Sequence, residues 1–255
     1  LTINGKPYRD QIDITSDEFW ELFPKIKQFT TGASNIGEVT SAFTDLGKTT
    51  NNIVCIVVSK ALSGTYDWAV KASEIIKSEQ PNLNIEVIDS KTAAGAQGFI
   101  VLEAARAARA GKNLAEVIQV AQDMIPRVKF LVGMDTLKYL IRLGRAPKTA
   151  VIGNILQVKP IIGMVSGTGL VENLGRTRGR RKAMTKMVDM IKDYVDTEKP
   201  VHLMVHYTDG MEPARELKDM VTSQLNCAEL YLTPYTPVMA TATGPVVAVS
   251  FYSQE

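Results

Sequence analysis

The segment I-V-C-I-V-V-S-K-A-L-S-G-T, residues 53–65, decides the fold class of this chain. Residues 53–58 are all apolar or β-branched, a pattern typical of a strand buried on both faces of a parallel sheet. A short loop rich in hydroxyl groups follows, and residues 66–78 then continue with helical spacing. Where a buried strand ends and a helix begins, backbone N–H groups and the helix dipole can bind an anion. An ordinary connection in which Ser63 only caps the helix is the alternative, and the segment alone leaves both readings open.

Composition places the chain among globular proteins long enough for two domains. It has 255 residues, 45% of them hydrophobic, and 29 basic residues against 27 acidic ones. This balance gives no overall attraction to nucleic acid. Two cysteines are too few to favour a disulfide framework or a zinc site, which fits a reducing compartment. Because we find no signal peptide and no apolar run of roughly 18 to 20 residues, we expect a cytoplasmic protein without a membrane span.

The order of expected elements divides the chain into an α/β half and an α+β half. Over residues 1–127 strands alternate with helices, which predicts a parallel sheet with helices on its faces. Over residues 128–255 a hairpin at the turn S-G-T-G, residues 166–169, predicts a mixed or antiparallel sheet with helices. We expect a ligand slot between the two domains, because clefts between such domains are common binding sites. The chain also begins without methionine, and we expect that an N-terminal segment is missing from it.

Motifs for catalysis are not visible in the sequence. It contains no G-x-x-x-x-G-K-[ST] segment, no G-x-G-x-x-G segment after a strand and no G-x-S-x-G segment. His202 and His206 stand four residues apart on an expected strand, so they face the same side but lie too far apart to share a metal ion. We therefore predict no catalytic residue and no metal ligand.

Residues 176–182, R-T-R-G-R-R-K, form the one concentrated charge in the chain. A solvated helix start is the default interpretation, but cations at a helix N-terminus oppose the helix dipole. That cost suggests a use, either docking an acidic partner or binding a phosphate. Nucleic acid is a weaker candidate, because neither interleaved aromatic residues nor wider basicity accompanies the cluster.

Hydroxyl groups gather in three separate loops, residues 30–35, 59–65 and 241–245. With Arg145, which follows an expected helix, they could form a cup of donors for one carboxylate or phosphate. Each charge-assisted hydrogen bond of this kind contributes about 1.5 to 3 kcal/mol. Arg145 alone is more often only a cation at a helix C-terminus.

Taken together, these features resemble the DegV family of bacterial fatty-acid-binding proteins, the lipid-carrying subunits of fatty acid kinase. The resemblance spans nearly the whole chain and rests on the order of several short motifs. The matching segments are N-G-K-P-Y-R-D (4–10) with D-I-T (13–15), S-K-A-L-S-G-T (59–65), E-V-I-D-S-K (86–91), D-T-L-K-Y-L (135–140) with G-R (144–145), K-P-I (159–161) and R-G-R (178–180).

The resemblance implies a two-domain fold with an acyl chain buried between the domains. Hydroxyls of the first and central loops would hold the carboxylate, and basic residues would meet the kinase subunit. The implied carboxylate-binding residues are Thr31, Ser63, Gly64, Thr65, Arg145, Thr241 and Thr243, and the implied partner-binding residues are Arg176, Arg178 and Arg180.

Three features depart from the family pattern. Ala242 stands where the family has a histidine in T-H-T-G-P-G, and residues 32–34 are G-A-S where the family has Ser-Gln-Pro. The family also begins with one more strand, which carries an Asp-Ser motif. Loss of the histidine removes a switchable donor beside the carboxylate, and with it a group that would assist phosphoryl transfer in the implied role.

We therefore predict a non-enzymatic protein that binds a long-chain fatty acid and presents its carboxylate to a separate ATP-dependent kinase subunit. The fatty acid is its expected ligand, with no further cofactor, no nucleic acid partner and at most transient membrane contact. A phosphotransferase or hydrolase that acts on a small phosphorylated metabolite is the alternative. A regulatory protein that binds nucleic acid through residues 176–182 ranks last.

Overall fold

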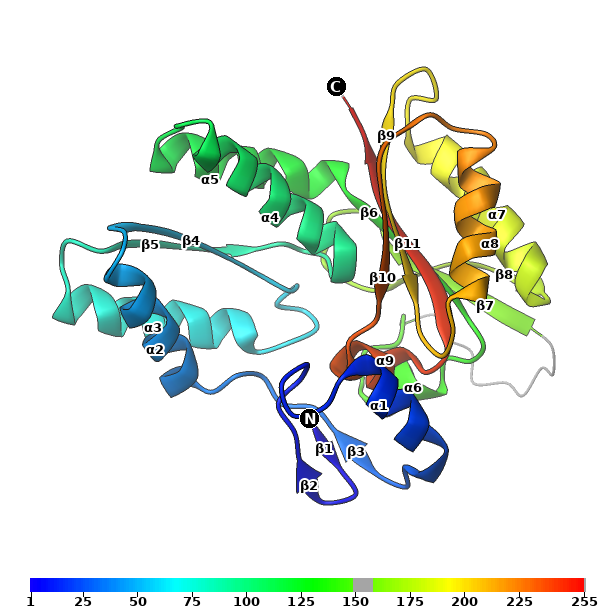
Figure 1. Ribbon diagram of the computed structural model, residues 1–255, viewed down its shortest axis with the longest axis horizontal. Helices are drawn as coiled ribbons and strands as arrows, with labels where there is room; N and C mark the ends of the chain where they lie inside the picture. The colour runs from blue at the N-terminus through cyan, green and yellow to red at the C-terminus, as the bar shows by residue number, and fades with distance from the viewer. Residues whose placement is uncertain (149–157, 255) are drawn as a thin grey trace. The chain divides into compact units, whose positions relative to one another are not determined.

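The computed structural model describes residues 1–148 and 158–254, and the chain divides into two compact units (Figure 1). Unit 1 comprises Leu1–Gly32, Lys129–Val165 and Val171–Glu255, and unit 2 comprises Ala33–Val128 and Ser166–Leu170.

Unit 2 is built on two parallel strands between two pairs of helices. Strand β4 (Asn52–Val57) pairs with β5 (Asn84–Asp89) in parallel, with Asn52 opposite Asn84. The parallel arrangement of the first half of the chain is therefore confirmed for these strands. Helices α2 and α3 lie on one face of the pair and α4 and α5 on the other (Figure 1). These helices span Ile36–Gly47, Thr65–Glu79, Ala94–Arg109 and Leu114–Arg127.

Local signals explain where these helices begin and what they cover. Asn35 and Asn113 each accept a hydrogen bond from the backbone N–H of a glutamate three residues later, in a complete capping box. The faces of α2 and α3 that meet the strands are apolar and form one core, which contains Phe43, Ile53, Ala72, Ile76 and Leu83. Helix α5 runs on through Pro126 to Arg127.

Unit 1 contains a mixed sheet of six strands in the order β10-β9-β11-β6-β7-β8. Strands β9 and β10 are parallel, and all other neighbours are antiparallel, which confirms the mixed sheet expected for the second half. The strands span Lys129–Met134 (β6), Val158–Met164 (β7), Glu172–Arg178 (β8), Val201–Tyr207 (β9), Cys227–Pro234 (β10) and Val246–Ser253 (β11).

Two long helices cover one face of this sheet. Helix α7 (Arg180–Tyr194) packs on β6, β7 and β8, and α8 (Glu212–Thr222) packs on β9 and β11 (Figure 1). The inward positions expected for α7 are all buried, and they join Leu203, Val249 and Phe251 in one core. Burial of each such side chain contributes about 1.5 to 3 kcal/mol, so this layer fixes the sheet beneath it. The inward positions of α7 are Met184, Met187, Val188 and Ile191.

The first 32 residues belong to unit 1, so the predicted domains 1–127 and 128–255 need correction. Helix α1 (Ser16–Leu22) buries Phe19 in a cluster that includes Ala240, near the other end of the chain. The Ser16 hydroxyl donates to the Tyr235 carbonyl at 2.7 Å, and the Val238 N–H donates to Asp10 at 3.2 Å. The segment also forms a small antiparallel sheet from β1 (Thr2–Ile3), β2 (Lys6–Pro7) and β3 (Phe29–Thr30).

The last hydroxyl-rich loop expected from the sequence, residues 241–245, overlaps a further helix. Thr236 caps α9 (Pro237–Thr243) by accepting from the Met239 N–H at 3.5 Å, and proline occupies its first position. Proline suits this place because its fixed backbone angle matches the helix and no hydrogen bond is lost there. Helix α9 packs on the short helix α6 (Lys138–Arg142).

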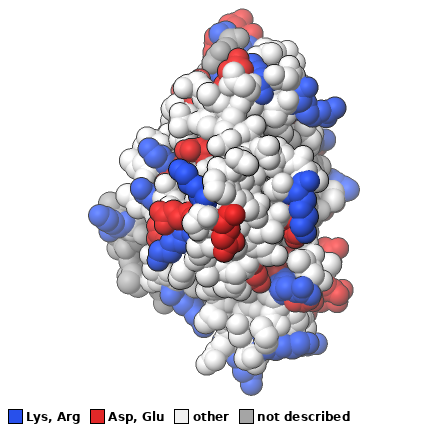
Figure 2. Space-filling model, turned by 90° about the vertical axis from the view of Figure 1, so that its left-hand side faces the viewer, with Lys and Arg blue, Asp and Glu red and all other residues white. Residues whose placement is uncertain are grey.

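Within the described ranges, no helix is long and apolar enough to cross a lipid bilayer. On the face drawn in Figure 2, acidic and basic side chains are interspersed. That face carries no broad field of one sign of the kind that draws a protein to nucleic acid.

Candidate functional site

Two loops of unit 2 follow the parallel strands and meet at the carboxyl ends of these strands. We call residues 59–65, after β4, and residues 89–93, after β5, the strand-end loops. The Ser59 N–H donates to the Thr92 carbonyl at 2.9 Å, and Asp89 accepts from the backbone N–H groups of Lys60 and Lys91 at 3.2 and 3.0 Å. Asp89 therefore holds the two loops together.

Ser59 anchors the strand-end loops to Ser166–Leu170, the part of the connection between β7 and β8 that belongs to unit 2. Its side chain is fully buried and donates to the Gly169 carbonyl at 2.8 Å. Gly169 has a φ of +81°, and a Cβ atom there would lie 2.5 Å from the Ser59 hydroxyl. Only glycine fits this contact, so Ser59 has a structural role that leaves its hydroxyl occupied.

Ser63, Gly64 and Thr65 are brought together at the start of α3. The two hydroxyls lie 2.8 Å apart, and the Thr65 N–H donates to the Ser63 oxygen at 3.3 Å. One hydroxyl must donate to the other, so the pair offers a single O–H to a ligand. Gly64 is the residue before the helix, and no side chain caps α3. The uncapped N–H groups and the remaining hydroxyl can bind an oxyanion.

Thr92 is a candidate that reading the sequence missed. It is 3% exposed, and its hydroxyl has no hydrogen-bond partner within the described residues. It stands two residues before α4, whose start also lacks a side-chain cap. A buried hydroxyl without a partner is energetically costly, which favours a ligand that would accept its hydrogen bond. Thr92 therefore adds a donor to the carboxyl end of the two strands, beside a second uncapped helix. The only sequence signal was the D-S-K-T segment after a strand.

In unit 1, the hydroxyls of Thr241 and Thr243 already donate within α9. Thr241 donates to the Val238 carbonyl at 2.7 Å, and Thr243 lies 3.2 and 3.0 Å from the Met239 and Gly244 carbonyls. Both residues are buried. Each hydroxyl has one hydrogen, so binding a carboxylate would require breaking one of these bonds. The prediction placed both residues in an open loop, which the helix corrects.

Arg145 and Thr31 are the predicted residues of unit 1 that keep donors available. Arg145 follows Gly144 at the end of α6 and is half-buried, and no acidic side chain of the described residues pairs with it. Burial lowers the pKa of its guanidinium, but an arginine stays charged. Thr31 follows β3 and is half-buried, and its hydroxyl has no partner within the described ranges. The half-buried cation of Arg145 favours an anionic ligand.

The predicted carboxylate-binding residues are thus shared between the units. Thr31, Arg145, Thr241 and Thr243 belong to unit 1, whereas residues 63–65 belong to unit 2. The packing of α6 on α9 brings Arg145 and the two threonines of α9 to the same end of unit 1. That all these residues bind one ligand stays a prediction.

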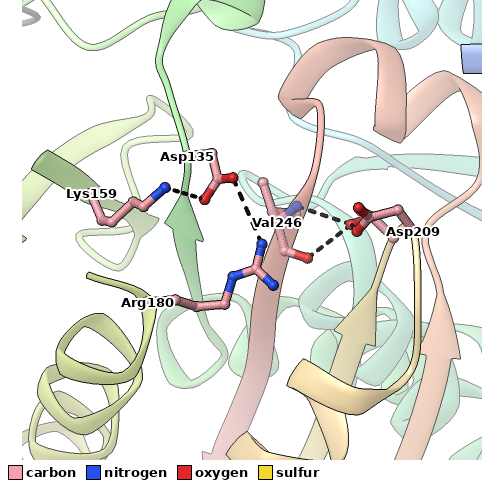
Figure 3. A network of polar contacts seen from close by, with 6 residues as sticks. Asp135, Lys159, Arg180, Asp209 and Val246 are labelled. Carbon is pink, nitrogen blue, oxygen red and sulfur yellow. Dashed lines mark hydrogen bonds and ion pairs between the residues drawn. The ribbon is translucent and has the colours of Figure 1, made fainter. Parts of the chain in front are cut away.

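The basic cluster lies on the outermost strand of the unit 1 sheet and the helix that follows it. Arg176 and Arg178 are exposed on β8, and Arg180 is the first residue of α7. Arg180 lies 3.7 Å from Asp135, which Lys159 also contacts at 2.8 Å (Figure 3). Arg176 and Arg178 have no such partner among the described residues, so they are the cations most available to another molecule.

The two histidines of unit 1 face the same side of β9, as expected, and both are buried. His206 lies 2.6 Å from the Thr233 hydroxyl and 3.0 Å from the Ser250 hydroxyl. Burial lowers its pKa from 6.5 to about 3, so the ring is neutral and a poor base. His202 stacks on Tyr252 with ring centroids 4.3 Å apart. Within the described residues, no group of three His, Cys, Asp or Glu side chains is placed to hold a metal ion.

Comparison with known proteins gives a consistent family. Residues 1–254 match the DegV family, described as a family of uncharacterised proteins. A DegV domain-containing protein of Caldanaerobacter subterraneus is 32% identical over 258 residues, which covers 100% of this chain and 89% of that protein. One from Lactococcus lactis is 30% identical over 215 residues, covering 84% of this chain and 74% of that protein.

Solved structures of DegV proteins share the fold. A DegV protein of Thermus thermophilus, described for its fatty acid binding, has a TM-score of 0.90 at 23% identity, covering 99% of this chain and 89% of that one. A DegV protein of Eubacterium eligens loaded with heptadecanoic acid has a TM-score of 0.88 at 18% identity, covering 100% and 90%. A stearic acid-binding protein of Eubacterium ventriosum has a TM-score of 0.86 at 23% identity, covering 99% and 88%.

Proposed function

Because this chain belongs to the DegV family, we propose that it binds a long-chain fatty acid and presents the carboxylate to a separate ATP-dependent kinase subunit. The observation that carries the proposal is the half-buried Arg145, a cation without an acidic partner in the described residues. One solved protein with the same fold is loaded with heptadecanoic acid, and another is described as stearic acid-binding. An acyl chain would supply most of the affinity, since each buried methylene contributes about 0.8 kcal/mol.

The proposed head-group residues differ in what they can offer. Arg145 supplies charge and Thr31 a hydroxyl in unit 1, and the Ser63–Thr65 pair supplies one O–H beside the uncapped start of α3 in unit 2. Thr241 and Thr243 would take part only after giving up hydrogen bonds inside α9. Ala242 lies between them and carries no proton donor, so the proposal assigns no acid–base step to this helix.

Native mass spectrometry of the purified protein, followed by denaturing extraction, tests the ligand class. We expect one fatty acid for each chain. A phosphorylated small molecule in its place would support the phosphotransferase or hydrolase alternative, because the same donors also suit a phosphate. A protein that is empty and takes up no added palmitic or oleic acid would contradict the proposal.

Ser63→Ala should weaken fatty acid binding by about 1 to 3 kcal/mol, because it removes a hydroxyl from the pair at the start of α3. The measurement is a competitive titration with a fluorescent fatty acid. Ser78→Ala is the matched control, since Ser78 lies near the other end of the same helix and donates to the Ile75 carbonyl. Equal affinity of both variants would remove Ser63 from the site.

Arg176→Ala combined with Arg178→Ala should weaken binding to the kinase subunit at least tenfold while leaving fatty acid content unchanged. Exposed cations that meet an acidic surface act mainly on the association rate, so the loss should shrink as salt increases. Association is measured by biolayer interferometry at two salt concentrations. Arg215→Ala is the control, because Arg215 is also exposed but lies on α8. A similar loss in the control would mean that the surface is not specific.

A further inference from the structure

Strand β5 leaves one of its edges open. Within the described residues the sheet of unit 2 has the order β4-β5, so β5 has one neighbour. The Asn84 N–H donates to the Asn51 carbonyl at 2.8 Å, and the Ser90 N–H donates to the Val57 carbonyl at 3.1 Å. The backbone N–H and C=O groups of successive residues in a strand point alternately to its two neighbours, so those of the even-numbered residues bond to β4. The backbone groups of Ile85 and Val87 therefore point to the open edge.

A groove of about 400 Å³ runs along this edge between α3 and α5. Its volume lies within the roughly 300–1,000 Å³ typical of ligand pockets. We call it the β5 groove. It is lined by Val70, Ser73, Glu74, Lys77, Pro81, Leu83, Asn84, Ile85, Glu86, Leu114 and Ile118.

The two sides of the β5 groove differ in chemistry. Ile85 packs in the core under α2 and α3, so the next residue, Glu86, faces α5. Glu86 is exposed, forms no ion pair with another described residue and lines the groove together with Leu114 and Ile118 of α5. On the α3 side, Val70 gives an apolar floor below the exposed Glu74 and Lys77. The rim carries the carboxylates of Glu74 and Glu86 and the single ammonium group of Lys77, so its net charge is negative.

We infer that the β5 groove binds an extended segment of a partner protein, which adds to β5 as a further strand and alternates basic and apolar side chains. The segment would exchange backbone hydrogen bonds with Ile85 and Val87. Its lysines or arginines would face α5, where their charges meet Glu86 and their stems cover Leu114 and Ile118. Its apolar side chains would pack over Val70.

Charge also argues against a second copy of this chain as the occupant. Antiparallel pairing of β5 with its own symmetry mate would bring each Glu86 close to the other. Like charges on neighbouring strands are destabilising, and charged edge residues are a common device against self-association. The same side chain that repels a second copy attracts a basic strand. The inference is independent of the fatty acid proposal, because none of the proposed head-group residues lines the groove.

The test uses the whole protein and fluorescein-labelled peptides of about eight residues, long enough to span β5. One peptide alternates lysine with valine and the other alternates glutamate with valine. We expect the lysine peptide to bind at least tenfold more tightly by fluorescence anisotropy. Hydrogen exchange should slow at the amides of Ile85 and Val87 when it binds.

Val87→Pro should abolish this binding without unfolding the protein. The Val87 N–H points to the open edge, so proline removes no bond to β4 yet blocks a new strand. Glu86→Lys should reverse the preference toward the glutamate peptide, and Glu79→Lys, outside the groove, should not.

Three results would overturn the inference. They are failure of the lysine peptide to bind, equal binding of both peptides, and binding that is unchanged in Val87→Pro. Dimerisation in analytical ultracentrifugation that Val87→Pro abolishes would replace the partner strand with a second copy. Circular dichroism reports whether each variant is folded.

Discussion

Gly244→Ala should lower the free energy of unfolding by about 3 kcal/mol, one of the two largest effects we expect. Gly244 ends α9 with φ of 66° and ψ of −158°, a region open essentially to glycine alone, where other residues cost roughly 1–3 kcal/mol. A Cβ atom there would also lie 2.6 and 2.9 Å from the Cδ2 and Cζ atoms of Tyr139. Overpacking of this kind adds about 1–3 kcal/mol. Urea denaturation measures the sum.

Gly144→Ala measures the cost of a positive φ at a glycine without close neighbours, and a second substitution at Tyr139 isolates the contact. Gly144 has nearly the same φ, 67°, but a Cβ atom there meets nothing within 4 Å. This control should therefore lose only the cost of the backbone conformation, about 1–2 kcal/mol. Tyr139→Leu in the Gly244→Ala background should recover part of the difference. If Tyr139→Leu recovers no stability in the Gly244→Ala background, the contact between the new methyl group and Tyr139 contributes nothing to the loss.

The consequence reaches the candidate site, because Gly244 and Tyr139 join the helices that carry its residues in unit 1. Thr241 and Thr243 lie on α9, and Arg145 follows α6. A shift of Tyr139 that makes room for a methyl group would move the two helices apart. Weaker fatty acid binding in Gly244→Ala is therefore expected even where the protein is fully folded.

The sequence predicted the elements whose signals are local. The apolar run at residues 53–58 folds as β4, and α3 begins one residue before its expected start. Apolar runs, helical spacing and capping residues determine such elements directly, because each depends on neighbours within a few positions. The pairing of Ser63 with Thr65 was accessible for the same reason.

Contacts between distant parts of the chain could not be predicted in this way. Ser16 bonds to Tyr235, which is 219 positions away in the sequence, and Val238 bonds to Asp10, which is 228 positions away. Periodicity carries no information about such pairs, so residues 1–32 were assigned to the wrong unit. Thr92 was missed because a hydroxyl in a loop gives no sign of being buried without a partner.

The error at α9 has a different origin. Alternating threonines before Gly-Pro are typical of a loop, and they outweighed the Thr236-Pro237 pair, which is typical of a helix start. The helix turns the hydroxyls of Thr241 and Thr243 onto backbone carbonyls. A residue type that suits a binding site can therefore be occupied by local structure, which only the coordinates reveal.

Acid should destabilise the protein through His206 by up to about 5 kcal/mol. Its pKa is about 3 in the folded chain, against 6.5 for an exposed histidine. Between these values the unfolded chain binds a proton that the folded chain does not, so stability rises with pH across this window and is complete above pH 6.5. Each unit of pKa difference corresponds to about 1.4 kcal/mol. Urea denaturation at a series of pH values from 4 to 7 measures the slope.

His206→Gln should reduce that slope by about 1.4 kcal/mol per pH unit between pH 4 and 6, whatever it costs at neutral pH. Glutamine keeps polar atoms near Thr233 and Ser250, but it cannot take up a proton. The change in slope therefore reports the buried imidazole and not lost packing. The chain has two histidines, so His202→Gln completes the comparison. A slope that survives in His206→Gln and disappears in His202→Gln would assign the acid sensitivity to the other ring.

Among the residues that the structure describes, no charged group offsets the cost of protonating His206. The ring that packs on it at 5.4 Å belongs to Tyr235, whose pKa burial raises, so that phenol stays neutral as well. Phe130 contacts the imidazole edge to face at 6.1 Å. Thr233 and Ser250 supply dipoles but no negative charge, and a buried imidazolium needs a counter-ion to be stable. Protonation of this imidazole should therefore favour opening of this part of the unit 1 sheet.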